Sequence, residues 1–138
     1  MGWASDLQFG EEGERYAISK LQRTAVRKME GNFSAFDYIV VNGTNIELYE
    51  VKTDRLAKNT GNIAVEFQCI QATRADYWLF VIYPDVYKVP VSVLKNWIDC
   101  LLYSSIVQGG DNNKSILYLF PRELFSPFKL ADGPEASG

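Results

Sequence analysis

Two charged side chains, Glu50 and Lys52, lie two residues apart in the largely apolar segment 46–52. Residues i and i+2 of a β-strand point to the same face, so both would share that face with Ile46 and Leu48. Burying charged groups is costly unless they are paired. The two side chains therefore either form a structural ion pair or are held on this strand for chemistry.

A β-hairpin is predicted around these residues. Residues 36–41 and 46–52 have the apolar, β-branched and aromatic composition of strands. Between them, Asn42-Gly43 is a strong signal for a hairpin turn. The hairpin would bring residues of the first strand opposite the charged residues of the second.

The register of the hairpin decides which residue faces Glu50. A loop formed by residues 42–45, or by 43–44 alone, places Asp37 directly opposite Glu50, with Cβ atoms about 4.5–5.5 Å apart. Two carboxylates there repel each other, and one is driven toward its protonated form unless a cation lies between them. A turn that begins one residue earlier would place Asp37 opposite Leu48 instead.

In the first of these registers, Asp37, Glu50 and Lys52 converge on one face. Two carboxylates beside an ammonium group form a site for a hard cation that prefers oxygen ligands, such as Mg²⁺. A cation held there would polarise a phosphodiester and activate water, while the lysine orients the water or neutralises developing charge. The three residues thus predict metal-assisted hydrolysis of phosphodiester bonds.

The composition narrows the chemistry further, because the 138 residues include no histidine. This excludes Ser-His-Asp and Cys-His nucleophilic mechanisms, His-ligated zinc and a histidine general base. The two cysteines, Cys69 and Cys100, match no metal-binding spacing and are interpreted as small buried residues. Any catalysis must then come from carboxylates, lysines and a hard metal ion.

The length and composition indicate one globular domain. We expect it to span residues 1–130, followed by a small polar tail at 131–138 that is disordered. No apolar run is long enough to cross a bilayer, and the first residues lack the apolar core of a signal peptide. The expected location is the cytoplasm, or the host cytoplasm if the source is viral.

The pattern along the chain predicts an α/β sandwich on a mixed sheet, with an antiparallel meander after an N-terminal helix. The amphipathic segment 9–29 is the predicted helix, and the alternating segment 62–70 is a third strand. The apolar run 77–84 is typical of a strand buried on both faces at the centre of a sheet. The other predicted elements are a strand at 86–89, a helix at 90–103 and a short strand at 115–120.

The dipeptide FD at 36–37, followed after the hairpin by EVK at 50–52, resembles the signature of the PD-(D/E)XK nucleases, with phenylalanine in place of the proline. The GE pair at 13–14 resembles the part of the preceding helix that supplies an additional acid in this superfamily. The resemblance covers residues 10–83 in element order, and in layout it is strongest to small Holliday-junction resolvase-like and phage members. It implies a restriction-endonuclease-like α/β/α sandwich with a central mixed sheet.

The resemblance also implies roles for individual residues. Asp37 and Glu50 would bind Mg²⁺, for which Mn²⁺ substitutes, with the main-chain carbonyl of Val51 as a further ligand. Lys52 would position the attacking water, and Glu14 would help to hold the metal or its water shell. The implied activity is that of an Mg²⁺-dependent deoxyribonuclease, an endonuclease selective for junction or duplex DNA that acts as a homodimer.

Further side chains are candidates for supporting roles. Glu66 and Gln68 point to one face of the predicted third strand and would orient water or metal ligands, unless that face is simply exposed. Although the net charge is −3, basic residues gather in segment 15–29. The candidate phosphate contacts are Arg23, Arg27, Lys28, Thr53, Arg55, Lys58 and Arg74.

Two other interpretations stay open. In one, the chain is a catalytically inactive nucleic-acid-binding or assembly module that retains the nuclease fold. In the other, it is a structural α/β domain in which Glu50 and Lys52 form an ion pair, and divalent metals do not affect its stability. For Glu14, the alternative interpretation is a solvated residue in an acidic helix start, where Glu11 and Glu12 would interact with the helix dipole equally well.

Overall fold

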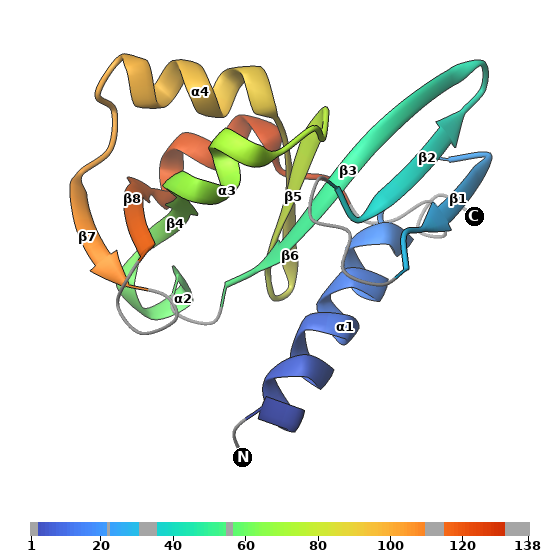
Figure 1. Ribbon diagram of the computed structural model, residues 1–138, viewed down its shortest axis with the longest axis horizontal. Helices are drawn as coiled ribbons and strands as arrows, with labels where there is room; N and C mark the ends of the chain where they lie inside the picture. The colour runs from blue at the N-terminus through green and yellow to red at the C-terminus, as the bar shows by residue number, and fades with distance from the viewer. Residues whose placement is uncertain (1–2, 22, 31–35, 55–56, 110–114, 132–138) are drawn as a thin grey trace.

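The computed structural model describes residues 3–21, 23–30, 36–54, 57–109 and 115–131. Its centre is a five-stranded sheet in the order β1-β2-β3-β5-β6 (Figure 1). Neighbouring strands pair antiparallel except β3 and β5, which run parallel, so the sheet is mixed as predicted. The strands are β1 (Ala25–Lys28), β2 (Tyr38–Asn42), β3 (Asn45–Thr53), β5 (Tyr77–Ile82) and β6 (Asp85–Pro90).

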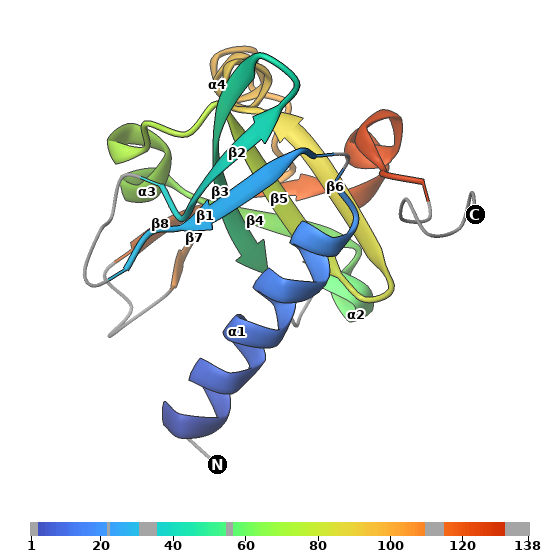
Figure 2. The same cartoon turned by 90° about the vertical axis from the view of Figure 1, so that its right-hand side faces the viewer.

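Helix α1 (Trp3–Ser19) packs against one face of this sheet (Figure 2). Ala17 and Ile18 of α1 join Val40 of β2 and Leu79 of β5 in a buried hydrophobic core. The apolar residues near the end of the helix thus fix it against the strands that surround the charged residues of the hairpin. Among the described helices, none has the length and apolar character needed to cross a membrane.

The opposite face of the sheet is covered by a second layer that contains short helices and a smaller antiparallel sheet in the order β4-β8-β7 (Figure 1). A second core lies between the layers and includes Trp78, Phe80, Leu94 and Phe120. The predicted α/β/α sandwich is confirmed, and the small sheet is an addition to its second layer. The elements of this layer are α2 (Ala57–Thr60), β4 (Asn62–Glu66), α3 (Phe67–Ala72), α4 (Val91–Asp99), β7 (Ser105–Gly109), β8 (Ser115–Pro121) and the 3₁₀ helix η2 (Arg122–Phe128).

Strand β5 confirms the prediction for the apolar run 77–84. Trp78 and Phe80 face the core of the second layer, whereas Leu79 and Val81 face the core beneath α1. All four side chains are inaccessible to solvent because both faces of the strand are covered. Since β5 pairs with β3, it also supplies an apolar surface beside the charged residues of β3.

The hairpin of β2 and β3 has the register in which Tyr38 lies opposite Tyr49. Its two-residue turn begins at Gly43, which has a φ of 65° that glycine adopts without steric cost. This confirms the first of the two registers considered for the sequence. Asp37 lies immediately before the paired residues of β2 and therefore near Glu50.

The predicted helix at 9–29 is wrong in its second half. Helix α1 ends at Ser19, and residues 25–28 form β1, which pairs antiparallel with β2. The N–H of Thr24 donates to the carbonyl of Val41 at 2.7 Å, so this segment takes its hydrogen bonds from a neighbouring strand. Pairing with the edge of β2 therefore makes this segment a strand, despite its local helical pattern.

The predicted third strand at 62–70 is also wrong beyond Glu66. Residues 67–72 form helix α3, and β4 pairs with β8 rather than with the hairpin. The antiparallel meander does not continue into β4 because β5 occupies the second edge of β3.

Elements nearer the C-terminus agree in part with prediction. The strands expected at 86–89 and 115–120 are confirmed as β6 and β8. The predicted helix at 90–103 ends earlier, at Asp99, and Leu101 follows with a positive φ of 60° before β7, a strand that was not predicted. In the predicted tail, residues 132–138 lie outside the described residues.

Candidate active site

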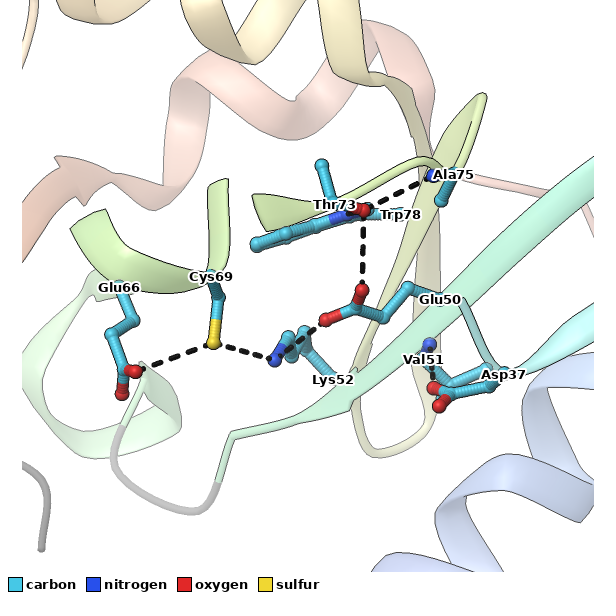
Figure 3. A network of polar contacts seen from close by, with 9 residues as sticks. All are labelled: Asp37, Glu50, Val51, Lys52, Glu66, Cys69, Thr73, Ala75 and Trp78. Atoms are coloured by element: carbon cyan, nitrogen blue, oxygen red, sulfur yellow. Dashed lines mark hydrogen bonds and ion pairs between the residues drawn. The ribbon is translucent and has the colours of Figure 1, made fainter. Parts of the chain in front are cut away.

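The charged residues of the hairpin lie where β2 begins and β3 approaches its end (Figure 3). Asp37 is held by its backbone, since its N–H donates to the Tyr49 carbonyl at 2.8 Å and its carbonyl accepts from Met29 N at 2.8 Å. Its carboxylate Oδ2 accepts the N–H of Val51 at 2.9 Å. Both the backbone and the side chain of Asp37 are therefore fixed against β3.

Glu50 is buried, with 7% of its surface exposed. Its Oε2 pairs with Lys52 Nζ at 2.8 Å, and its Oε1 accepts the hydroxyl of Thr73 at 3.2 Å. Thr73 Oγ1 in turn accepts the indole N–H of Trp78 at 3.1 Å. Both carboxylate oxygens have partners, as a buried charge requires.

Lys52 extends over the ring of Trp78, with Nζ 5.0 Å from the ring centroid. Nζ also lies 3.5 Å from Cys69 Sγ, and that thiol lies 3.3 Å from Glu66 Oε1 (Figure 3). Burial by itself would lower the pKa of Lys52, but the neighbouring Glu50 carboxylate and Cys69 outweigh it and the pKa is raised. Lys52 is therefore a fixed positive charge at neutral pH.

The surroundings of Asp37 favour a cation. Burial raises the pKa of its carboxyl, the hydrogen bond from Val51 N–H opposes that rise, and the negative charges of Glu50 and Glu14 add to it, so that the pKa is raised overall. The positive charge of Lys52 offsets only part of this effect. A further positive charge beside Asp37 would stabilise its ionised form.

Helix α1 brings Glu14 to the same end of the sheet because Gly13 allows a close approach to β3. A Cβ atom at Gly13 would overlap with Thr53 Oγ1, so a larger residue requires a shift of the helix or of Thr53. Glu14 Oε1 accepts the hydroxyl of Tyr38 at 3.0 Å and pairs with Lys28 Nζ at 2.9 Å. Glu14 is thus tied to β1 and β2.

The donor atoms of this region suit a hard divalent cation. Asp37 Oδ1 makes no hydrogen bond to any described residue, and carboxylate oxygens are the ligands that Mg²⁺ prefers. Within the described parts of the chain, no three acidic or cysteine side chains come close enough together to hold a metal ion. A cation here would therefore rest on Asp37 and Glu50, with main-chain and water oxygens completing its shell, as is usual for Mg²⁺.

Glu66 and Gln68 do not share a strand face as predicted. Glu66 ends β4 and reaches Lys52 through Cys69. Gln68 is exposed on α3, and its Oε1 accepts the N–H of Ile116 at 3.3 Å. Of the two side chains, Glu66 is the one connected to the charged residues of the hairpin.

The predicted phosphate contacts fall at different places on the surface. Arg55 and the side chain of Lys58 lie outside the described residues. The described ones are Arg23, Arg27 and Lys28, which are exposed on or beside β1, Arg74, which is exposed after α3, and Thr53, which is partly buried at the end of β3.

A pocket of about 300 Å³ lies beside Lys52. Lys52 and Glu66 line it together with apolar side chains that include Trp78 and Leu117. The Lys52 ammonium has three donors, and Glu50 and Cys69 accept two of them. The pocket thus provides room for water or a substrate oxygen next to the third.

Three residues of the site are not predicted from the sequence. Thr73 and Cys69 hold Glu50 and Lys52, and Tyr38 holds Glu14. The positions of Thr73 and Cys69 bear no recognisable spacing to the acids and the lysine, because these two residues reach the site through the position of α3 in the second layer. Tyr38 directly follows Asp37 in sequence, but its contact with Glu14 depends on the packing of α1 on the sheet.

Comparison with known proteins finds similarity in structure rather than in sequence. No model of a protein family matches the sequence, and no curated protein matches it significantly. The bacterial homing endonuclease I-Ssp6803I is similar in structure, with a TM-score of 0.54 and 21% sequence identity over 67% of this chain and 69% of the endonuclease. The chain has a restriction-endonuclease-like fold.

This fold is the one that the signature resemblance implied, and the prediction is confirmed. A second solved structure, Hjc from Archaeoglobus fulgidus, a Holliday junction resolvase from an archaeal hyperthermophile, matches with a TM-score of 0.46 and 14% identity. That match covers 97% of this chain and 99% of the resolvase.

Proposed function

We propose that this protein is a metal-dependent nuclease that hydrolyses the phosphodiester bonds of DNA. One observation carries the proposal: the ion pair of the buried Glu50 with the partly exposed Lys52 lies beside a third charged group, Asp37, whose pKa is raised. A structural ion pair alone gives no reason to fix a further carboxylate in the same place. The fold shared with a homing endonuclease supports this function by analogy.

The residues have separate roles in this proposal. Asp37 and Glu50 would hold Mg²⁺, or Mn²⁺ in its place, with the carbonyl of Val51 as a further ligand. The bound ion would supply Lewis-acid polarisation of the phosphodiester and a more acidic water. Lys52 would orient the attacking water and stabilise the negative charge that develops on the phosphate. Glu66 would act through Cys69 to keep the lysine in position.

We extend the proposal to the substrate and the assembly. Duplex and four-way junction DNA both present two strands to be cut, and a two-fold homodimer of one small domain would present one site to each strand. Sedimentation equilibrium should give the mass of two chains. A monomer that cuts both strands of a duplex in a single binding event would remove the dimer from the proposal.

The test of the activity uses labelled single-stranded, duplex, flap and four-way junction DNA, each with Mg²⁺, Mn²⁺ or EDTA. Wild type is compared with Lys52→Ala, and Lys88→Ala serves as the control. Lys88 is a matched lysine because its side chain is about as exposed, 27% against 33%, and its ammonium also lies near aromatic rings. We expect cleavage that requires a divalent metal, a loss of about a hundredfold or more in Lys52→Ala, and nearly full activity in Lys88→Ala.

The outcome separates this function from its alternatives. Binding of DNA without cleavage of any substrate would favour the inactive nucleic-acid-binding module. A lack of cleavage, of DNA binding and of any thermal shift with Mn²⁺ would leave Glu50 and Lys52 as a structural ion pair. Equal losses in Lys52→Ala and Lys88→Ala would show that the assay reports folding rather than chemistry.

A further inference from the structure

The basic edge strand β1 leads directly to the candidate active site. Lys28, its last residue, lies opposite Tyr38 on β2, and the next residue, Met29, donates its N–H to the carbonyl of Asp37. Every residue of β1 is exposed. A strand at a sheet edge with exposed basic side chains is well placed to contact a phosphate backbone close to Asp37.

Lys28 is engaged by an acid of the site. Its Nζ lies 2.9 Å from Glu14 Oε1, the same oxygen that accepts the Tyr38 hydroxyl at 3.0 Å. The two partners differ in exposure, since Tyr38 is 6% exposed whereas half of the Lys28 side chain is in solvent. Tyr38 is therefore a fixed partner of Glu14, and Lys28 is free to move on a four-carbon stem.

The ion pair of Lys28 and Glu14 exchanges easily. Exposed ion pairs contribute little to stability, and a phosphate oxygen is as good an acceptor for an ammonium group as a carboxylate. If Lys28 turned to a phosphate, Glu14 would stay in place through Tyr38 but would lose its compensating charge. Glu14 is near enough to Asp37 to interact with it electrostatically, so the site would become more negative and more attractive to a cation.

We propose that Lys28 exchanges Glu14 for a phosphate of the DNA backbone, and that this exchange couples the binding of DNA to the binding of the divalent cation. The inference rests on the proposed function and assigns it a substrate-sensing residue. Because such a coupling is reciprocal, DNA raises the affinity for the cation by the same factor as the cation raises the affinity for DNA.

Two separate affinities test the exchange, neither of which requires cleavage. The first is the affinity of the DNA-free protein for Mn²⁺, measured by the electron paramagnetic resonance signal of free Mn²⁺. The second is the affinity for a labelled duplex in EDTA, measured by fluorescence anisotropy over a range of salt concentrations. The variants are Lys28→Met, Glu14→Gln and, as a control that also removes one positive charge, Lys20→Met, whose ammonium lies over the ring of Tyr16 rather than beside an acid of the site.

The two variants of the ion pair should have opposite effects. Lys28→Met should bind Mn²⁺ about two- to fivefold more tightly and duplex DNA about two- to fivefold more weakly than wild type. Its slope of log affinity against log salt should also decrease by about 0.9, the value for one lost phosphate contact. Glu14→Gln should bind Mn²⁺ more weakly and DNA more tightly, because Lys28 is then free. Lys20→Met should leave the affinity for Mn²⁺ unchanged.

Weaker Mn²⁺ binding by Lys28→Met, or values equal to those of Lys20→Met in both assays, would overturn the exchange. A general loss of structure would weaken both affinities together, so the opposite signs report the exchange itself. If wild type cuts DNA with Mn²⁺ and only the opposite signs are missing, this inference fails and the proposed function survives. If wild type binds neither Mn²⁺ nor DNA, both fail.

Discussion

Two Glu–Lys ion pairs lie at the same end of the central sheet, one on each of its faces. Glu50 and Lys52 are 2.8 Å apart on the face covered by the second layer, and Glu14 and Lys28 are 2.9 Å apart on the face covered by α1. The two distances are nearly equal, but 9% and 33% of the side chains are exposed in the first pair against 22% and 50% in the second. Burial, rather than pairing, therefore distinguishes them.

The difference in burial gives the two pairs different energetic roles. Glu50 has little water to replace a lost partner, so it depends on Lys52 and Thr73, whereas the partly exposed Lys52 is held by Glu50 and Cys69. The pair of Glu14 and Lys28 has water as an alternative partner and is easily exchanged. The buried pair is suited to hold groups in fixed positions for chemistry, and the exposed pair is suited to respond to a ligand.

The largest difference in stability between the two pairs is expected when the lysine of each is replaced by methionine. Lys52→Met leaves Glu50 buried with one charged partner fewer, and should lower the free energy of unfolding in EDTA by about 2 kcal/mol, less than for a fully buried pair because Lys52 is partly exposed. Lys28→Met should lower it by less than about 1 kcal/mol. Urea unfolding monitored by tryptophan fluorescence gives both values.

The same unfolding measurements with added Mn²⁺ distinguish the two pairs further. A cation beside Glu50 would replace the missing ammonium, so Mn²⁺ should restore stability to Lys52→Met more than it stabilises wild type. Equal losses in the two variants, or no response of Lys52→Met to Mn²⁺, would show that the two pairs do not differ as their burial indicates.

A smaller effect is expected from the helix that places Glu14. Gly13→Ala puts a methyl group against Thr53 Oγ1 and should destabilise the protein by about 1–3 kcal/mol through overpacking. Gly10→Ala is the control, because the added methyl would meet no described atom within 4 Å apart from its chain neighbours and the backbone of its own helix, and it should stabilise α1 by up to about 1 kcal/mol. Thermal unfolding of both variants and of Gly13→Ala/Thr53→Ala, in which space is regained, gives the comparison. If Gly13→Ala and Gly10→Ala were both stabilising, α1 would not pack tightly against β3.

The smallest effect should come from Asp37, which lies between the two pairs. Because its pKa is raised above the ordinary value of 3.8 in the folded protein, its contribution to stability is present below pH 3.8 and is lost as pH rises through the folded pKa. In EDTA, as pH rises from 3.8 through the folded pKa of Asp37, the free energy of unfolding of wild type should therefore fall relative to that of Asp37→Asn. Urea unfolding at a series of pH values measures the difference. A gap that widens in favour of wild type as pH rises would contradict the raised pKa.

The sequence predicts those parts of the fold that follow from local pattern. The Asn42-Gly43 signal and the two-residue period of the flanking strands predict the hairpin itself. They leave two registers open, and the structure decides for the one that brings Asp37 near Glu50. The apolar run of β5 is long enough to indicate a strand covered on both faces.

Other parts depend on partners that are distant in sequence. Residues 25–28 become a strand because β2 has a free edge, and residues 67–72 become a helix although residues 62–66 before them alternate as in a strand. Thr73 and Cys69 join the site through packing between layers, which leaves no spacing to find. Tyr38 directly follows Asp37, but it meets Glu14 only because α1 packs on the sheet. The proximity of the acids and the lysine thus follows from the sequence in one of the two registers, whereas their contacts with Thr73, Cys69 and Tyr38 do not.

The most direct test of the central claim is the initial rate of duplex DNA cleavage by wild type and by Asp37→Asn, each with Mn²⁺ and with EDTA. Asn keeps an oxygen that accepts the Val51 N–H but lacks the charge, so the fold should be retained while cation binding is weakened. We predict metal-dependent cleavage by wild type and a rate lower by about a hundredfold or more in Asp37→Asn. Equal rates for the two proteins, or cleavage in EDTA, would contradict a site built on Asp37, Glu50 and Lys52.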